Sequence, residues 1–266
     1  MMRWKPLEDA GPFMAAFTSR WGGVSPGFEG GLNLSFHVGD SAGAVLANRT
    51  LVAGALGIAL DDLVLAEQVH GNRVRLVGAE HAGAGAYAGG TALPAVDALV
   101  TSTPGLVLAG CFADCVPVYI IDSEHTAVGL AHAGWRGTAG RIAQATFQAM
   151  HGQFGSRGNG CVALVGPAIG RCCYHVGPDV ALAMQDHEYW QEVASPGPGG
   201  GWSLDLAAAN CRQLEAVGIT RVHVAGMCTS CDPGFFSHRR DRGQTGRMMA
   251  LLGIRAGAGK ARGGGE

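Results

Sequence analysis

The sequence predicts an α+β fold, formed by one large domain or two small ones. The chain has 266 residues, of which 47% are apolar and 15% charged, a profile typical of compact globular proteins. Short runs rich in β-branched residues predict strands, and runs with apolar residues at steps of three and four predict helices. Two of the strands flank a short polar turn, which indicates a β-hairpin.

The first half of the chain is predicted to contain one helix among several strands. The helix begins after Asp40 or Ser41, either of which can cap it, and continues to about Leu56. Arg49 lies beside the apolar stripe of this helix and is expected to face solvent. Residues 78–93 are rich in Gly and Ala and predict a flexible surface loop, either a lid, an insertion or a linker. Strands are predicted over residues 13–17, 63–69, 73–77, 97–102 and 106–111.

The second half contains the hairpin and most of the helices. Thr138 and Asp205 are good N-caps for helices over residues 139–151 and 206–217. Further helices are predicted from residue 179 and over residues 248–253, where the fold ends. We expect residues 1–255 to form the domain and residues 256–266 to be a disordered tail. Strands are predicted over residues 116–121, 126–131, 161–165 and 221–225.

The hairpin brings a cysteine and a histidine together. If residues 123–124 form a two-residue loop, Asp122 faces His125 and Cys115 faces His132. Cross-strand partners have Cβ atoms about 4.5–5.5 Å apart. Zn–S and Zn–N bonds are about 2.3 and 2.1 Å long, so such a pair can bind one metal ion.

His70 is a candidate for a third ligand. It ends a predicted strand and precedes Gly71 and Asn72, so it either caps a tight turn or binds metal. Catalytic zinc usually has three protein ligands and one water. His70 would complete such a set with Cys115 and His132.

Arginines supply the basic chemistry of the chain. Arg136 lies just before Thr138, and a helix N-terminus beside an arginine is a favourable anion site. Arg171 and His175 occupy a Gly- and Pro-containing turn and are further site candidates. Other arginines in glycine-containing loops are Arg20, Arg239, Arg240 and Arg247.

The eight cysteines indicate reduced thiols, metal ligands or a nucleophile rather than a disulfide framework, because no secretory signal is recognisable. The adjacent Cys172 and Cys173 are expected to be structural. Cys228 and Cys231 form a CxxC motif, which indicates either a redox pair or half a zinc site. The sequence leaves the roles of both pairs open.

Composition also excludes several classes of function. No apolar run approaches about 18 residues, so no membrane span is expected, and we expect a cytoplasmic protein. The net charge of −2 argues against a general nucleic-acid binder. Lysines occur only at positions 5 and 260, near the ends, which argues against a Schiff-base mechanism.

A set of motifs in order spans nearly the whole chain. They are NLSFHVGD (33–40), QVHG (68–71), DALVT (97–101), ADCVP (113–117), HAGWRG (132–137), GPAIG (166–170), CCY (172–174), CTSCDP (228–233), FSHRRD (236–241) and TGR (245–247). The set resembles the YfiH-like family, known as laccase-domain or polyphenol oxidoreductase proteins and as purine nucleoside phosphorylases. Phe112 and Ser230 depart from residues common in the family, and neither is a proposed ligand.

The resemblance implies a single domain with four layers, α/β/β/α, and mixed β-sheets. It implies that His70, Cys115 and His132 bind one zinc ion. It also implies phosphorolysis of adenosine, inosine, guanosine or methylthioadenosine, together with adenosine deamination. The phosphate site would come from the six arginines named above, with Asn33 and His175 as further substrate-binding candidates. Asp114 either orients a ligand or shuttles a proton, or is an ordinary buried carboxylate.

Three alternatives remain open at this stage. A copper-dependent polyphenol oxidase needs a trinuclear cluster, but the ten histidines show no paired HxH pattern. A metal-free cysteine hydrolase would use Cys115 and His132 as nucleophile and base. A zinc-stabilised binding module would need a fourth protein ligand. The sequence ranks neither the purine substrates nor the oligomeric states.

Overall fold

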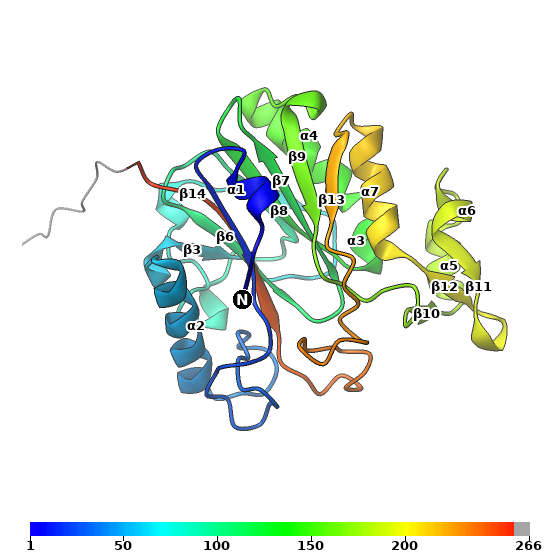
Figure 1. Ribbon diagram of the computed structural model, residues 1–266, viewed down its shortest axis with the longest axis horizontal. Coiled ribbons are helices and arrows are strands. Elements are labelled where there is room, and N and C mark those ends of the chain that lie inside the picture. The colour runs from blue at the N-terminus through cyan, green and yellow to red at the C-terminus, as the bar shows by residue number, and fades with distance from the viewer. Residues whose placement is uncertain (258–266) are drawn as a thin grey trace, which may run out of the picture.

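In residues 1–257, which the computed structural model describes, two large β-sheets lie face to face (Figure 1). The predicted disordered tail, 256–266, falls almost entirely outside this range. No helix in the described range is long and apolar enough to cross a membrane.

The first large sheet is mixed and has the order β1-β2-β14-β6-β3. Strand β14 pairs antiparallel with β2 and β6, and β3 runs parallel to β6. The bounds are β1 (Met2–Arg3), β2 (Phe13–Phe17), β3 (Leu63–Leu65), β6 (Val107–Phe112) and β14 (Met248–Ile254).

The second large sheet is also mixed and has the order β13-β9-β7-β8-β5-β4. The pairs β13·β9 and β5·β4 are parallel, and the others are antiparallel. Its strands are β4 (Val74–Leu76), β5 (Ala98–Thr101), β7 (Val116–Asp122), β8 (Ala127–Ala133), β9 (Cys161–Val165) and β13 (Arg221–Val224). A small antiparallel sheet contains β10 (His175–Val176), β12 (Trp202–Leu204) and β11 (Ala194–Pro196).

The helices are mostly short. Ser41 and Asp205 cap α2 and α7 as predicted, because each side chain accepts a hydrogen bond from a backbone N–H three residues on. The α-helices are α1 (Lys5–Glu8), α2 (Ala42–Leu56), α3 (Trp135–Ala139), α4 (Ile142–Phe154), α5 (Pro178–Met184), α6 (Trp190–Val193) and α7 (Leu206–Ala216). The 3₁₀ turns are η1 (Leu60–Asp62), η2 (Ala79–His81), η3 (Gly89–Thr91), η4 (Gly158–Gly160) and η5 (Pro198–Gly200).

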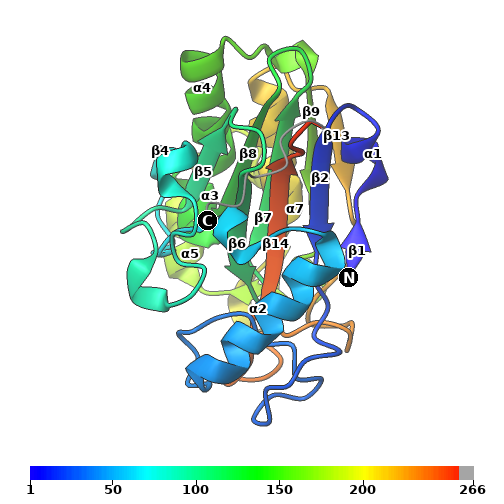
Figure 2. The same ribbon diagram turned by 90° about the vertical axis from the view of Figure 1, so that its left-hand side faces the viewer.

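Helices cover the outer face of each large sheet (Figures 1 and 2). Helix α2 contributes Val52 to an apolar cluster with Leu251 and other residues of the first sheet. Helices α4 and α7 contribute Phe147 and Leu214 to a cluster on the second sheet. A third cluster fills the space between the sheets and includes Leu252. This arrangement confirms the four-layer α/β/β/α fold, and burial of apolar side chains in three successive layers stabilises it.

The helix predicted over residues 248–253 is wrong, because this segment is strand β14 in the middle of the first sheet. Met and Leu favour helices, but a short, fully apolar run does not distinguish a helix from a buried strand. Every residue of β14 is buried, Leu251 toward α2 and Leu252 toward the other sheet. Burial of both faces explains the continuous apolar run.

The predicted register of the hairpin is also wrong. Asp122 pairs with Ala127, and His132 pairs with Pro117. The loop is longer than two residues because the Asp122 carboxylate accepts hydrogen bonds from the turn and binds the His125 ring at 2.7 Å. The shift amounts to two positions, so each side chain keeps its face of the sheet. Cys115 lies just outside the ladder, beside His132.

The helix predicted over residues 139–151 is divided in two. Arg141 has φ of 59°, which separates α3 from α4. Thr138 is not an N-cap, because it lies inside α3 and accepts a hydrogen bond from the Asn210 side chain. The anion site predicted at Thr138 is therefore absent from that position, where the side chain is fully buried.

Residues 78–93 form a loop that is attached to β3 rather than a flexible linker. The Leu65 N–H donates to the carbonyl of Ala84, and the Leu93 N–H donates to the carbonyl of Leu65. Arg49 does not face solvent, because its guanidinium donates to the carbonyls of Gly85 and Ala86. The loop therefore forms a wall against the first sheet.

Candidate metal centre

Three side chains from separate parts of the chain meet at one end of the two sheets. The ligand atoms of His70, Cys115 and His132 all lie within 4.8 Å of one another. His70 follows β3, Cys115 immediately precedes β7, and His132 lies in β8. The structure thus brings together the three predicted ligands.

Asp97 positions both histidines. Its Oδ1 atom lies 2.9 Å from His132 Nδ1 and accepts the backbone N–H of His70, also at 2.9 Å. Its Oδ2 atom accepts the N–H groups of Val69 and Gly71 at 3.2 and 2.7 Å. His70 has a positive φ of 60°, and these bonds hold the backbone in that conformation. Because His132 uses Nδ1 for Asp97, its Nε2 atom remains for a metal.

The cysteine and the buried histidine polarise each other. Burial opposes ionisation of Cys115, but the adjacent His132 and hydrogen bonds from both histidines lower its pKa to about 6. Burial also disfavours the charged form of His132, but Cys115 and Asp97 raise its pKa to about 9. The lowered pKa favours the thiolate of Cys115, which is the form that binds metal.

The donor set fits a zinc ion with an open coordination position. Two imidazoles and one thiolate are ligands that zinc prefers. Within residues 1–257, no fourth His, Cys, Asp or Glu ligand atom joins this group. His70 is exposed, whereas His132 is buried, so the cluster has one side toward solvent.

The cluster borders a cavity of about 620 Å³. This volume lies within the range of about 300–1,000 Å³ that is typical for small-molecule sites. Three aromatic side chains line it, Phe36, Trp135 and Tyr174, together with the buried Arg49. The cavity therefore offers flat apolar surfaces next to the metal ligands.

Three of the predicted substrate-binding residues line this cavity, Arg136, Arg239 and Arg247. The Arg136 guanidinium lies 4.2 Å from the centre of the Trp135 ring. Arg247 Nη1 donates to the carbonyls of Thr245 and Gly246, which fixes its guanidinium in the wall. The cavity thus carries positive charge beside the cluster.

The other predicted substrate-binding residues do not line the cavity and have structural contacts instead. Arg20 donates to the Glu29 carbonyl, and Asn33 is fully buried and accepts the Arg247 N–H. Arg171 donates to the Glu192 carbonyl, and His175 contacts the Ser203 hydroxyl. Arg240 donates to backbone carbonyls and to Asp241 within its own loop.

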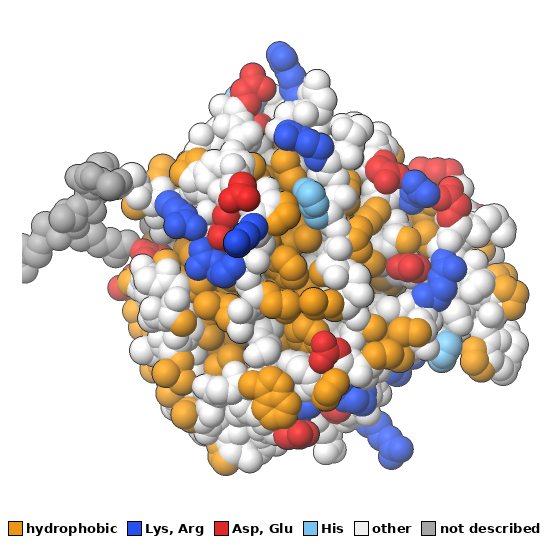
Figure 3. All heavy atoms as spheres, in the orientation of Figure 1, with side chains coloured by type: hydrophobic (Ala, Val, Ile, Leu, Met, Phe, Trp, Pro, Cys, Tyr) orange, Lys and Arg blue, Asp and Glu red, His pale blue; other side chains and the backbone are white. Residues whose placement is uncertain are grey.

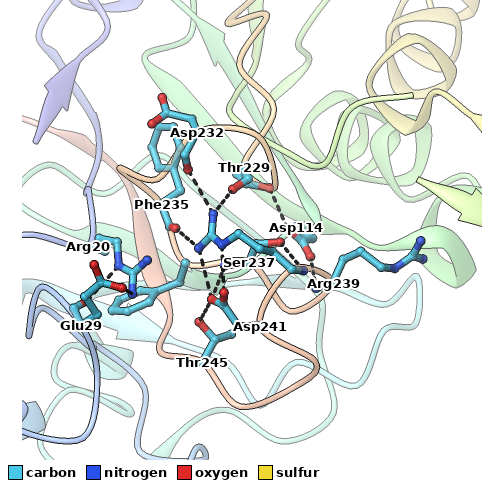
Figure 4. A network of polar contacts seen from close by, with 12 residues as sticks. Arg20, Glu29, Asp114, Thr229, Asp232, Phe235, Ser237, Arg239, Asp241 and Thr245 are labelled. Carbon is cyan, nitrogen blue, oxygen red and sulfur yellow. Dashed lines mark hydrogen bonds and ion pairs between the residues drawn. The ribbon is translucent and has the colours of Figure 1, made fainter. Parts of the chain in front are cut away.

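Asp114 connects the cluster to two loops. Its Oδ1 accepts the Thr229 hydroxyl at 2.7 Å, and its Oδ2 accepts the Arg239 N–H at 2.7 Å (Figure 4). Its own carbonyl accepts the Ile169 N–H, and its φ is 89°. Both carboxylate oxygens are occupied, so the contacts are those of a buried hydrogen-bonding carboxylate.

Sequence reasoning did not identify several of these residues. The sequence predicts Asp97 only as the start of a strand, although its place in the motif DALVT is a signal. Tyr174 and His238 also line the cavity and lie within motifs. The sequence carries no sign that Arg49 lines the cavity. The pattern of the helix does not show that a loop 36 residues later will accept the hydrogen bonds of Arg49.

The visible surface carries no continuous basic stripe. On the face shown in Figure 3, basic and acidic side chains are interspersed with apolar ones. This distribution agrees with the net charge of −2.

Comparison with known proteins finds named relatives that match most of the chain. It is 43% identical over 251 residues to the purine nucleoside phosphorylase YlmD of Geobacillus stearothermophilus, a match that covers 91% of this chain and 90% of that protein. It is 38% identical over 224 residues to adenosine deaminase RL5 of an unknown prokaryotic organism, with 82% and 85% covered.

Solved structures and family models agree with this placement. The structure of Bacillus licheniformis protein YfiH matches with a TM-score of 0.88 and 41% identity, covering 91% of this chain and 93% of that one. A family model described as multi-copper polyphenol oxidoreductase laccase matches residues 14–255. The chain therefore belongs to that family, which confirms the YfiH-like resemblance of its motifs.

Proposed function

We propose that this protein is a zinc-dependent purine nucleoside phosphorylase that also deaminates adenosine. The observation that carries the proposal is an open three-ligand cluster beside a cavity that arginines and aromatic side chains also line. Relatives at 43% and 38% identity that are named for these two activities support it.

His70, Cys115 and His132 would hold the zinc ion. Zinc in such a site supplies a Lewis acid and a water that ionises near neutral pH, which is the chemistry that hydrolytic deamination needs. Asp97 keeps the His132 ring in the tautomer that leaves Nε2 free. Asp114 acts as a positioning residue, since its two oxygens hold the connection between β13 and β14 at Thr229 and Arg239.

The cavity suits the two substrates of phosphorolysis. In that reaction a phosphate oxygen bonds to the anomeric carbon while the glycosidic C–N bond breaks and the purine leaves with the electron pair. Trp135 and Tyr174 offer faces on which a purine can stack. Arg136, Arg239 and Arg247 offer charge-assisted, bidentate contacts for phosphate.

Two rival functions have weaker support. A multicopper oxidase needs a trinuclear copper cluster, yet the groups among residues 1–257 that could hold a metal ion are this triad and a set of four cysteines. A cysteine hydrolase would use the thiolate of Cys115 with His132 as base, and the same contacts are compatible with it. Metal content separates the hydrolase from the phosphorylase.

The decisive experiment is an assay of metal-quantified protein with adenosine, with and without phosphate. Adenine and ribose 1-phosphate should appear only with phosphate, inosine should appear in both conditions, and Cys115→Ala should abolish all three products. Absence of turnover with zinc at the triad would contradict the purine assignment. Metal-free protein that hydrolyses the substrate without forming ribose 1-phosphate, and that loses this activity on alkylation of Cys115, would establish the hydrolase.

Arginine variants test the phosphate site separately. We expect Arg247→Met to raise the KM for phosphate at least tenfold, because one charge-assisted contact contributes about 1.5–3 kcal/mol. Arg171→Ala is the matched control, since Arg171 lies outside the cavity and bonds to a backbone carbonyl. An unchanged phosphate KM in Arg247→Met would remove Arg247 from the site.

A further inference from the structure

Four cysteines from two distant loops meet on the surface. Cys172 and Cys173 lie in the turn after β9, and Cys228 and Cys231 lie in the loop after β13. Their four sulfur atoms all lie within 4.8 Å of one another. Cys172 and Cys231 are exposed, and the other two are half-buried.

The sulfur separations match those of a tetrahedral metal site. Four sulfurs at a Zn–S distance of about 2.3 Å lie about 3.8 Å apart along the edges of the tetrahedron. The Cys231 sulfur lies 3.6 Å from that of Cys172 and 3.3 Å from that of Cys173. A disulfide would require about 2.05 Å between two of them.

The backbone around the cluster is arranged toward the sulfurs. The Gly170 N–H donates to the Cys228 sulfur at 3.2 Å. A Cβ at Gly170 would lie 3.3 Å from the Cys172 sulfur and 3.3 Å from Cys228 Cβ. Glycine at this position lets the first turn approach the second loop closely. Backbone N–H groups that donate to ligand sulfurs are a common outer contact of thiolate metal sites.

We propose that Cys172, Cys173, Cys228 and Cys231 bind a zinc ion in a structural site, distinct from the His70–Cys115–His132 cluster. Four thiolates close the coordination sphere, as in structural rather than catalytic zinc sites. Tetrahedral sulfur coordination selects zinc or iron, and among residues 1–257 no carboxylate or imidazole ligand that would favour another metal belongs to the group. The exposed sulfurs give the ion a path from solvent.

The site would hold together two loops that build the cavity wall. Tyr174 follows Cys173 and lines the cavity, and Arg239 donates to the Cys173 carbonyl at 3.2 Å. Thr229 follows Cys228 and donates its hydroxyl to Asp114. An ion that joins the two loops therefore fixes the positions of the aromatic and basic side chains around the cavity. Its role is stabilisation and positioning, without contact with the substrate.

Metal analysis of variants tests this proposal. We expect Cys115→Ala protein to retain one zinc per chain, with four sulfur neighbours at about 2.3 Å in X-ray absorption spectra. The double variant Cys228→Ser, Cys231→Ser should lose that zinc and keep the zinc of the other cluster. Cys211→Ser is the matched control, because Cys211 lies on α7 outside both groups, and it should keep both ions.

Three results would overturn the proposal. The first is Cys115→Ala protein that contains no metal after purification in zinc-supplemented medium. The second is iron in place of zinc, which refutes the metal assigned. The third is an intact mass two units below that of eight free thiols, which shows a disulfide.

The Cys115→Ala measurement needs no substitution in the cysteine cluster, so it decides the matter even if the double variant does not fold. If the unsubstituted protein lacks phosphorylase activity while Cys115→Ala gives the four-sulfur spectrum, the proposed function is refuted and this zinc site stands.

Discussion

Replacement of Asp97 by asparagine should weaken metal binding at the triad, although Asp97 touches no metal. The carboxylate accepts hydrogen bonds from the His132 ring and from the backbone of His70 and Gly71. An amide of the same shape has one oxygen, so its NH₂ group must face N–H donors on one side. If that side is His132, the ring is driven to the tautomer that carries its proton on Nε2, the atom that must bind metal.

The size of the effect follows from what the carboxylate holds. Loss of such an outer partner typically lowers metal affinity by about 10–100-fold, equivalent to about 1.4–2.7 kcal/mol. We expect the upper half of this range, because one Asp97 oxygen contacts both the His132 ring and the backbone of His70. Loss of the charge acts on two of the three ligands at once.

Zinc retained per chain, measured against buffered free zinc, gives the affinity directly. The zinc retained by Cys115→Ala is subtracted to isolate the triad. Asp122→Asn is the matched control, since Asp122 is a buried carboxylate paired with His125 at the other end of the same hairpin. A midpoint for Asp97→Asn within twofold of the unsubstituted protein, or equal to that of Asp122→Asn, would refute the reasoning.

Three further predictions concern stability and the shape of the site. Burial raises the pKa of Asp122, but the Ser156 hydroxyl and the ring and backbone N–H of His125 outweigh it and lower the pKa below its usual value. The ionised Asp122 therefore stabilises the fold fully above about pH 4, and this stabilisation is lost as the pH falls through the lowered pKa. In Asp122→Asn the unfolding free energy should fall less steeply with decreasing pH over that range. An unchanged slope would contradict the stabilising role of the Asp122 carboxylate. Leu252→Ala should lower the free energy of unfolding in urea by about 2–5 kcal/mol, because Leu252 is fully buried between the sheets. Leu51 is half-exposed, so Leu51→Ala should change this free energy by less than about 0.5 kcal/mol. Similar losses in the two variants would contradict the placement of Leu252 between the sheets. Gly134→Ala would place a methyl group 3.0 Å from the Cys115 sulfur. Zinc retention at the triad should therefore fall, while the midpoint of urea unfolding stays nearly constant. Unaltered zinc retention would show that Cys115 moves to accommodate the methyl group.

The sequence by itself determined most local elements and predicted which three side chains form the triad. The capped helices α2 and α7 and the strands of the hairpin follow from short-range patterns, because caps and alternation are set within a few residues. The motifs also placed the chain in its family, which the comparisons confirm. Cys115 and His132 lie on the same face of the hairpin in the predicted and the observed register, since a shift of two positions preserves the face.

Tertiary structure decided what depends on contacts between distant segments. Strand β14 is a strand because both of its faces are covered, and neither cover is visible in its own residues. Arg240 and Arg247 cannot be told apart from the sequence. Only the fold places Arg247 in the cavity wall and directs Arg240 to the backbone of its own loop. The four cysteines likewise form a cluster only because two loops meet. Local propensity acts over a few residues, whereas burial and ligand geometry are properties of surfaces that the fold assembles.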